Sequence, residues 1–439
     1  MIIQILINII LDTNFIKNKI TQKFKNKSSK TLLINFISLS ILQILNVLLP
    51  FLTIPYLIGI VGLKLFGLIT FSYSFAFFFQ IIVEYGFNTI GARDISINAK
   101  NYKRLNMIFS DIFYTKILLL ICSLIVYLII IFSFNPFKLN STLYIIQFGC
   151  VFGQALFPIW LFHGLQRMKY ITYINIFFKT FFTLLIFILV KQPEDYWLAP
   201  LCTALGLISS GIISLIIVYK KFHISFVKTS INRIKKQLNH GFYVFISEVQ
   251  IAAIANGNIL ILGFFGGNQA VGIYSAAEKI VRAIGNLQAP LINTLYPYVS
   301  KEMQINKRNI LNQLNKFKLY SSIILTIICL VLFIFTPFLF NLIYGNNHEN
   351  SVIVFRIIIL FPLLSFFDQF YGKLILLTNN DEKNFMKVFF ISSIFSVILS
   401  SILSYYYSFI GMAIANLAVQ FFIVLGMYYY AKKITNSYE

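Results

Sequence analysis

The chain has 439 residues, of which 58% are hydrophobic and only 11% are charged. A water-soluble domain carries about 25% charged residues, so this composition excludes a soluble enzyme or binding module. The formal net charge of +22 would suit a nucleic-acid-binding protein only if the basic residues shared one folded surface. Here they lie in the short segments between apolar blocks, so we expect a multi-pass membrane protein with no nucleic-acid partner.

Apolar blocks follow one another along the whole chain, each about as long as the roughly 20 residues that a membrane-spanning helix requires. They lie at residues 32–58, 66–90, 107–132, 141–162, 171–190, 196–219, 241–264, 271–300, 319–343, 352–377, 386–405 and 409–431. The sequence therefore predicts an all-α polytopic membrane protein with about 12 transmembrane helices.

The Lys and Arg residues are distributed unevenly among the segments that join these blocks. The N-terminal segment and every second segment after it hold 27 of the 36 basic residues, whereas the intervening segments hold only Lys64, Lys138 and Lys191. Cytoplasmic segments of membrane proteins carry the excess of Lys and Arg. Both termini are therefore predicted to lie in the cytoplasm.

The longest basic segment, residues 220–240, divides the chain into two groups of six spans. At an offset of 205 residues, Gly67 coincides with Gly272, and Asn88 coincides with Asn293. Because each group has an even number of spans, both share one orientation, as in transporters built from parallel repeats. We expect two six-helix lobes related by a pseudo-two-fold axis along the membrane normal. The predicted divisions are a cytoplasmic basic tail at 1–30, an N-terminal lobe at 31–219, a cytoplasmic basic linker at 220–240, a C-terminal lobe at 241–432 and a cytoplasmic tail at 433–439.

The eighth span contains three charged residues, Glu278, Lys279 and Arg282, within the stretch YSAAEKIVRAIGN. A charge near the bilayer centre costs roughly 2.5–3.5 kcal/mol on insertion scales. At 100° per residue, Glu278, Arg282 and Asn286 fall on one side of the helix together with several small residues. This side is predicted to face protein or a water-filled cavity. An ion pair between Glu278 and Arg282, or a hydrogen-bonded packing face, would also explain it.

Other spans also contain ionisable residues near the middle of the membrane, at depths counted at about 1.5 Å per residue from each loop. Such charges in both halves predict a hydrated cleft between the halves. Cations in it would bind phosphate groups, and carboxylates would serve as counter-ions or would exchange a proton or a sodium ion. The substrate-binding candidates are Arg282, Lys179, Lys116, Lys279 and Asn286. The coupling or counter-ion candidates are Glu278, Glu248, Asp368 and Glu84.

Motifs for covalent or nucleotide chemistry are missing from the sequence. It contains no Walker loop and no G-x-S-x-G elbow, and the four Cys and four His residues have no metal-binding or disulfide spacing. We therefore expect no catalytic residues, no metal site and no cofactor.

Four segments resemble the Wzx-type O-antigen and polysaccharide flippases, which belong to an exporter superfamily that also contains the multidrug-and-toxin (MATE) transporters and the lipid II flippase. These segments are Pro50–Ser74, Glu84–Ser96, Phe157–Tyr170 and Val271–Lys301. The resemblance extends from about residue 28 to the C-terminus. It implies a MATE-like fold and movement of an undecaprenyl-diphosphate-linked oligosaccharide from the cytoplasmic to the periplasmic leaflet of a bacterial inner membrane. The cleft residues would contact the substrate, with Arg282 on phosphate or sugar.

Two other functions compete with this one. A cation-coupled drug exporter of the MATE type would favour an acidic pocket, whereas the cations and carboxylates counted above roughly balance. An O-antigen polymerase or other membrane transferase needs a scaffold for catalytic groups, and the outer loops have only about six to nine residues. The sequence leaves open which glycan is carried, which ion is coupled, and whether polymerase or chain-length proteins dock on the basic loops.

Overall fold

The computed structural model describes residues 27–345 and 348–436, and all regular structure in these residues is helical. The predicted tail at residues 1–30 lies almost entirely outside the described residues. The first half of the chain forms α3 (Lys27–Glu84), α4 (Phe87–Ile97), α5 (Tyr102–Ser133), α6 (Asn135–Lys138), α7 (Ser141–Leu156), α8 (Ile159–Gly164), α9 (Met168–Leu189), the 3-10 turn η1 (Pro193–Trp197) and α10 (Leu198–Phe222).

The second half forms a similar series. It contains α11 (Ile231–Ala255), α12 (Gly257–Asn286), α13 (Ala289–Ile305), α14 (Lys307–Ile334), α15 (Thr336–Tyr344), α16 (Glu349–Ile358), α17 (Phe361–Gln369), the π-helical turn η2 (Phe370–Leu376), the 3-10 turn η3 (Leu377–Asn379) and α18 (Glu382–Asn436). Helices suit this apolar chain because each helix satisfies its own backbone hydrogen bonds where no water is available.

The number of membrane crossings agrees with the prediction. Within the described residues, nine helical segments are long and apolar enough to span a membrane. Three of them are interrupted by one residue with non-helical dihedral angles, at Gly62, Gly267 and Ser408, and each of these residues separates two crossings. The part of α12 before Gly267 is too short to cross alone and completes the crossing that α11 begins. Counted this way, the described chain makes twelve crossings.

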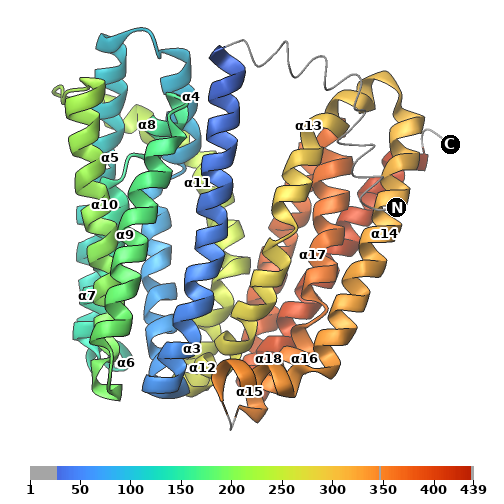
Figure 1. Ribbon diagram of the computed structural model, residues 1–439. Helices are drawn as coiled ribbons and strands as arrows, with labels where there is room; N and C mark the ends of the chain where they lie inside the picture. Colours follow the sequence, from blue (N-terminus) through green and yellow to red (C-terminus); the bar gives the residue numbers. More distant parts are fainter. Residues whose placement is uncertain (1–26, 346–347, 437–439) are drawn as a thin grey trace.

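The helices form two lobes that meet at one end of the molecule and diverge toward the other (Figure 1). The N-terminal lobe contains α3–α10 and the C-terminal lobe contains α11–α18. The largest apolar core joins the lobes, because it includes Phe71 and Phe75 of α3 together with Val271 and Tyr274 of α12. Two smaller cores lie within the individual lobes.

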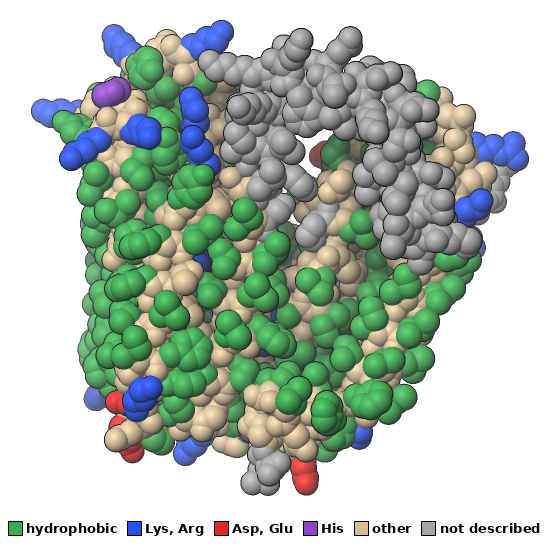
Figure 2. All heavy atoms as spheres, in the orientation of Figure 1, with side chains coloured by type: hydrophobic (Ala, Val, Ile, Leu, Met, Phe, Trp, Pro, Cys, Tyr) green, Lys and Arg blue, Asp and Glu red, His purple; other side chains and the backbone are tan. Residues whose placement is uncertain are grey.

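The surface is that of a multi-pass membrane protein. Apolar side chains cover the middle of the molecule, and Lys and Arg side chains gather mainly at the end where α3 begins (Figure 2). The last helix, α18, also ends there (Figure 1). We refer to this as the basic end and to the opposite one as the narrow end.

The two halves contact each other reciprocally at the narrow end. A Cβ atom added to Gly67 would lie 1.8 Å from the carbonyl oxygen of Asn268, and one added to Gly272 would lie 1.9 Å from the carbonyl oxygen of Leu63. The same offset of 205 residues relates Gly67 to Gly272 and Leu63 to Asn268. The matched glycines therefore allow α3 and α12 to cross backbone to backbone.

The linker between the lobes is partly helical and is fixed to the N-terminal lobe. Residues 223–230 have no regular structure, and α11 begins directly afterwards. Asn106 of α5 accepts a hydrogen bond from the backbone N–H of Ser225 at 3.2 Å and donates one to its hydroxyl at 3.1 Å. The N–H of Val227 donates to the hydroxyl of Ser110 at 2.8 Å.

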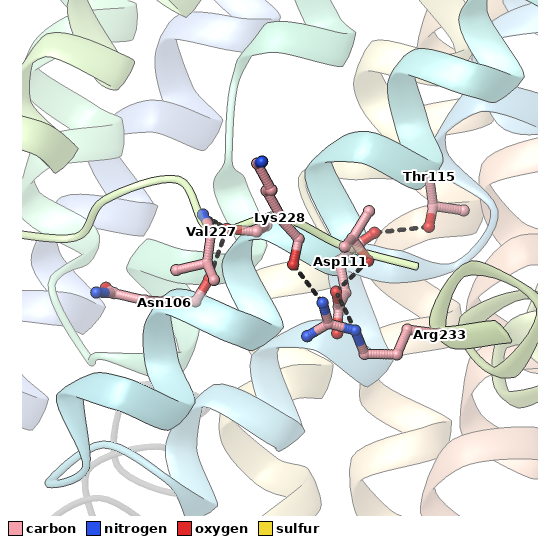
Figure 3. Close-up of polar contacts among 8 residues, drawn as sticks. Asn106, Asp111, Thr115, Val227, Lys228 and Arg233 are labelled. Carbon is pink, nitrogen blue, oxygen red and sulfur yellow. Dashed lines mark hydrogen bonds and ion pairs between the residues drawn. The ribbon is translucent and has the colours of Figure 1, made fainter. Parts of the chain in front are cut away.

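An acidic side chain completes this attachment (Figure 3). Asp111 accepts a hydrogen bond from the Thr229 hydroxyl and lies 3.6 Å from Nε of Arg233, in the first turn of α11. Arg233 also donates to the Lys228 carbonyl. We call these contacts the α5–linker clamp; they hold the start of α11 against the N-terminal lobe.

Candidate functional site

Three adjoining cavities lie around the inner half of α3. The largest, about 450 Å³, is enclosed by α3, α7, α9 and α10, and we call it the N-lobe chamber. The second, about 220 Å³, lies between α3, α12 and α15, and we call it the inter-lobe chamber. The third, also about 220 Å³, shares Thr53 and Tyr73 with the first and Ile54 and Lys279 with the second, so we call it the bridging chamber.

The part of α3 before Gly62, which we call its inner half, separates the N-lobe chamber from the inter-lobe chamber. Leu49 and Thr53 line the N-lobe chamber, whereas Val47 and Phe51 line the inter-lobe chamber. Asn46 belongs to both linings. This division follows from helix geometry, since residues four apart share a face and residues two apart do not.

The charges in these linings all have one sign. Lys179 lines the N-lobe chamber, Arg282 lines the inter-lobe chamber, and Lys279 lines the inter-lobe and bridging chambers. No Asp or Glu side chain is among the described residues that line the three cavities. The sequence had indicated roughly balanced charges in the cleft, whereas the described residues of these three linings contribute cations alone.

Arg282 is held on three sides. Its Nε donates to Oε1 of Glu278 at 2.7 Å, and a terminal nitrogen donates to the carbonyl of Ala255 at 2.9 Å. The guanidinium carbon lies 5.5 Å from the ring centre of Phe361. A guanidinium has five N–H donors, so these contacts fix its position and leave further donors for a ligand. The side chain is 28% exposed.

Lys279 differs from the other cations of the cleft. It lies about 18 Å along the helix from Gly267, at 1.5 Å per residue, well inside a hydrocarbon core of about 30 Å. Its ammonium group has no hydrogen bond or ion pair with any residue that the structure describes. Glu278 attracts it from a distance and Arg282 repels it. A charge without a close counter-ion at this depth is costly, which favours an anionic ligand beside it.

Glu278 lies behind the cleft rather than in it. The residue is 2% exposed, and its carboxylate lies 3.5 Å from the hydroxyl of Tyr274, which in turn accepts a hydrogen bond from Asn416 of α18. The ion pair considered from the sequence is therefore present, and only its Arg282 side borders a cavity. Asn286 lines the inter-lobe chamber, as the sequence suggested.

The two lysines of the N-terminal lobe have different positions. Lys179 lines the N-lobe chamber, and its ammonium group donates to Asn46 Oδ1 at 2.8 Å. Lys116 is 2% exposed, lies 3.5 Å from the carbonyl of Gln154 and borders none of the three cavities. The long side chain of Lys116 packs inside the lobe, and its predicted contact with substrate stays a prediction.

The remaining carboxylates also lie outside the three linings. Glu84 accepts hydrogen bonds from Gln154 at 2.8 Å and from Asn88 at 3.1 Å. Glu248 of α11 lies close to the Gly86 backbone and within electrostatic range of Glu84. Two carboxylates from different lobes thus lie near each other.

Asp368 belongs to the C-terminal lobe alone. Its carboxylate accepts a hydrogen bond from Gln420 of α18, and Lys373 lies close enough to attract it. Among the described residues, no group of three or more His, Cys, Asp or Glu side chains could hold a metal ion.

Comparison with known proteins places this architecture in a family. The model of the family described as "Polysaccharide biosynthesis protein" matches residues 32–303. The chain belongs to this family. A protein of Escherichia coli (strain K12) with the name "Putative O-antigen transporter" is 30% identical over 395 residues, which cover 90% of this chain and 95% of the relative. A protein of Shigella dysenteriae with the same name is 26% identical, with coverage of 90% and 98%.

Solved structures share the fold at low sequence identity. The lipid II flippase MurJ in an inward closed conformation has a TM-score of 0.73, with 14% identity and coverage of 91% of this chain and 87% of the other. A multidrug resistance MATE family transporter of the MOP superfamily, in an inward-facing conformation, has a TM-score of 0.65, with 14% identity and coverage of 90% and 100%. The predicted MATE-like fold is confirmed.

Several neutral polar residues of the cavities were not identified from the sequence of this family member. Asn46, Gln80, Gln154, Thr183 and Thr203 line the N-lobe chamber. The signal was present, because an amide inside an apolar span is costly unless it faces protein or water. A search for charged residues alone passes over it.

Proposed function

We propose that the protein is a flippase that moves an undecaprenyl-diphosphate-linked oligosaccharide from the cytoplasmic to the periplasmic leaflet of a bacterial inner membrane. The observation that carries this proposal is the charge of the cavity walls, which contain Lys179, Lys279 and Arg282 and no carboxylate among the described lining residues. Such walls attract an anion and repel an organic cation. Membership of the polysaccharide biosynthesis family supports the same substrate class.

The diphosphate is assigned to the inter-lobe chamber. Lys279 supplies an unpaired ammonium group, and Arg282 presents its remaining N–H donors from a position fixed by Glu278 and the Ala255 carbonyl. Charge-assisted hydrogen bonds from Arg and Lys are the usual means of binding phosphate groups. Because both side chains project from one helix, the diphosphate would bind across a single turn of α12.

The arrangement of the lobes supports an inward-open starting state. The lobes diverge toward the basic end and meet at the narrow end (Figure 1). Basic residues gather on the cytoplasmic side of membrane proteins, so we assign the basic end, and with it both termini, to the cytoplasm. The substrate would enter there while its polyprenyl tail remains in lipid, and closure at the basic end would release it outward.

We assign ion coupling to the carboxylates outside the cavities. Glu84 and Glu248 come from different lobes and lie near each other. Neighbouring carboxylates repel each other unless a proton or cation lies between them. Uptake or release of a proton or a sodium ion would therefore change how strongly the lobes attract each other. The proposed cycle involves no covalent chemistry.

The decisive experiment is translocation in proteoliposomes. Undecaprenyl-diphosphate-linked oligosaccharides are loaded in one leaflet, and a membrane-impermeant glycosidase reports their arrival in the other. Lys279→Ala should lower the translocation rate at least tenfold, because a hydrogen bond to a charged group contributes about 1.5–3 kcal/mol. Lys279→Arg should retain most of the rate.

The matched control removes the same charge elsewhere. Lys64 is exposed at the narrow end, and Lys64→Ala should leave the rate unchanged. If the wild-type protein moves no such lipid but takes up ethidium under a proton gradient, the protein is a drug exporter and the proposal fails.

A further inference from the structure

The N-lobe chamber has a chemistry different from that of the inter-lobe chamber. Seven of its lining residues carry amide or hydroxyl groups: Asn46, Thr53, Tyr73, Gln80, Gln154, Thr183 and Thr203. Its one cation, Lys179, already donates to Asn46. The wall therefore offers one cation among many neutral hydrogen-bonding groups, whereas the inter-lobe chamber has the two cations Lys279 and Arg282. The N-lobe chamber is thus better suited to a polar, uncharged part of a ligand.

Several of these groups are free to bind a ligand. The amide of Gln80 and the hydroxyl of Thr183 have no hydrogen-bond partner among the residues that the structure describes. Both side chains are partly buried. Thr203 donates to the Ala199 carbonyl of its own helix at 3.0 Å and retains its acceptor capacity. Polar groups inside a membrane span face protein, water or a polar ligand. These three come from α3, α9 and α10 and meet around one chamber, which suits a polar ligand.

Apolar surfaces lie beside the polar groups. The ring of Phe182 and the side chains of Leu45 and Ile186 also line the chamber. Small-molecule sites combine such apolar walls with a few placed polar groups, and their volumes start at about 300 Å³. A cavity of about 450 Å³ is therefore large enough for a small ligand that has both hydroxyl groups and apolar faces.

We infer that the N-lobe chamber is the glycan subsite, and that Gln80 and Thr183 select the sugar part of the substrate by hydrogen bonds to its hydroxyl and amide groups. This inference rests on the proposed flippase function. The bridging chamber adjoins both outer chambers and contains Lys279 in its wall. A single substrate can thus place its diphosphate at Lys279 and Arg282 and its sugars beyond the inner half of α3, in the other lobe.

Separate sites for the sugars and for the diphosphate would determine which substrates the protein accepts. A site built to hydrogen-bond a ligand's hydroxyl groups rejects a ligand that lacks them, because the buried groups of the site are then unpaired. The diphosphate is common to all substrates of this chemical class, whereas the sugars differ. Recognition of the glycan would therefore depend on the N-terminal lobe. Binding of the lipid diphosphate would depend on α12.

Equilibrium binding in lipid nanodiscs tests this inference with two probes. One is undecaprenyl diphosphate, and the other is undecaprenyl diphosphate that carries an N-acetylglucosamine-based trisaccharide. The wild-type protein should bind the second probe more tightly. The double variant Gln80→Leu with Thr183→Val should lose about tenfold in affinity for the trisaccharide probe, which is the loss of one to two net hydrogen bonds, and should bind the sugar-free probe as the wild-type protein does.

Two further variants distinguish a failure of the glycan subsite from a failure of the proposed function. Lys279→Ala should weaken the binding of both probes, and Thr326→Val should change neither, because Thr326 lies on α14 and bonds within its own helix. If the double variant weakens both probes equally or neither, the glycan subsite is refuted while the proposed function stands. If the wild-type protein binds neither probe, the proposed function fails and the glycan subsite fails with it.

Discussion

The Glu278 carboxylate is buried outside the cavity linings, and its negative charge lowers the positive potential in the cleft. Its side chain is 3% exposed and its Oε1 accepts a hydrogen bond from Arg282. Glu278→Gln would keep an acceptor for that bond and remove the negative charge. A unit charge about 10 Å from a ligand contributes roughly 1.7 kcal/mol at an effective dielectric constant of about 20. We therefore expect the variant to bind undecaprenyl diphosphate about tenfold more tightly, measured in nanodiscs.

The same substitution should lower stability, because Arg282 loses its buried counter-ion. Glu349→Gln is the matched control, since Glu349 is exposed at the start of α16; it should change neither affinity nor thermal stability. Weaker binding by Glu278→Gln would mean that the carboxylate acts mainly by orienting Arg282 and that its charge has little effect on the ligand.

The sequence predicted the charged residues of the eighth span but not the direction in which each one points. The helical projection centred the polar face on Glu278 and Arg282, whereas the cavity lies on the side of Lys279, Arg282 and Asn286. A projection shows which residues share a face, and it does not show which neighbour that face contacts. Here Tyr274 and α18 cover the Glu278 side, and only the folded chain reveals this.

At the scale of elements, the α5–linker clamp fixes the first helix of the C-terminal lobe to the N-terminal lobe. Phe226 adds ring contacts with Phe109 and Phe113 at 5.2 and 5.1 Å. The clamp concerns the site because α11 carries Glu248 and the Ala255 carbonyl that binds Arg282. The apolar blocks predicted the helices, but they could not predict this attachment, since it joins polar residues more than 100 positions apart.

Asp111→Asn should loosen the clamp. The substitution removes the charge that pairs with Arg233 and weakens the bond to Thr229. Loss of about 1.4 kcal/mol in local stability would raise amide hydrogen exchange in residues 224–233 about tenfold. Exchange measured by mass spectrometry should change little in α18.

Asp195→Asn provides a matched control for the clamp. Asp195 accepts hydrogen bonds from the backbone N–H groups of Lys191 and Gln192 in a loop at the narrow end. Its substitution should raise exchange in that loop alone. Unchanged exchange at residues 224–233 in Asp111→Asn would show that the ring contacts hold the linker without the ion pair.

At the scale of the whole molecule, the reciprocal crossing of α3 and α12 is the contact that closes the narrow end between the lobes. The sequence offset of 205 residues matched Gly67 with Gly272, and the structure brings the two together on the repeat axis. Gly62 and Gly267 are related by the same offset, and both have positive φ angles, 76° and 72°, at the turns before the crossing. The sequence alone showed that the two halves repeat. It could not show that the matched glycines of the two halves contact each other, because this depends on how the lobes pack.

Gly272→Ala should force the lobes apart at the narrow end. Its Cβ would meet the Leu63 carbonyl oxygen at 1.9 Å, a backbone atom that cannot move aside alone. If the lobes rock as rigid bodies about the apolar core that joins them beyond the crossing, opening at the narrow end brings the basic ends of α5 and α14 together. Spin labels at Lys103→Cys and Lys316→Cys, with the exposed Cys122 replaced by Ser, should therefore show a population at shorter distance in double electron–electron resonance.

Gly59→Ala is the matched control. It should leave the distance distribution unchanged, because a Cβ at Gly59 meets no atom within 4 Å. An unchanged distance distribution in Gly272→Ala would mean that the crossing yields by local helix distortion, and that its closure is not linked to the spacing of the basic ends.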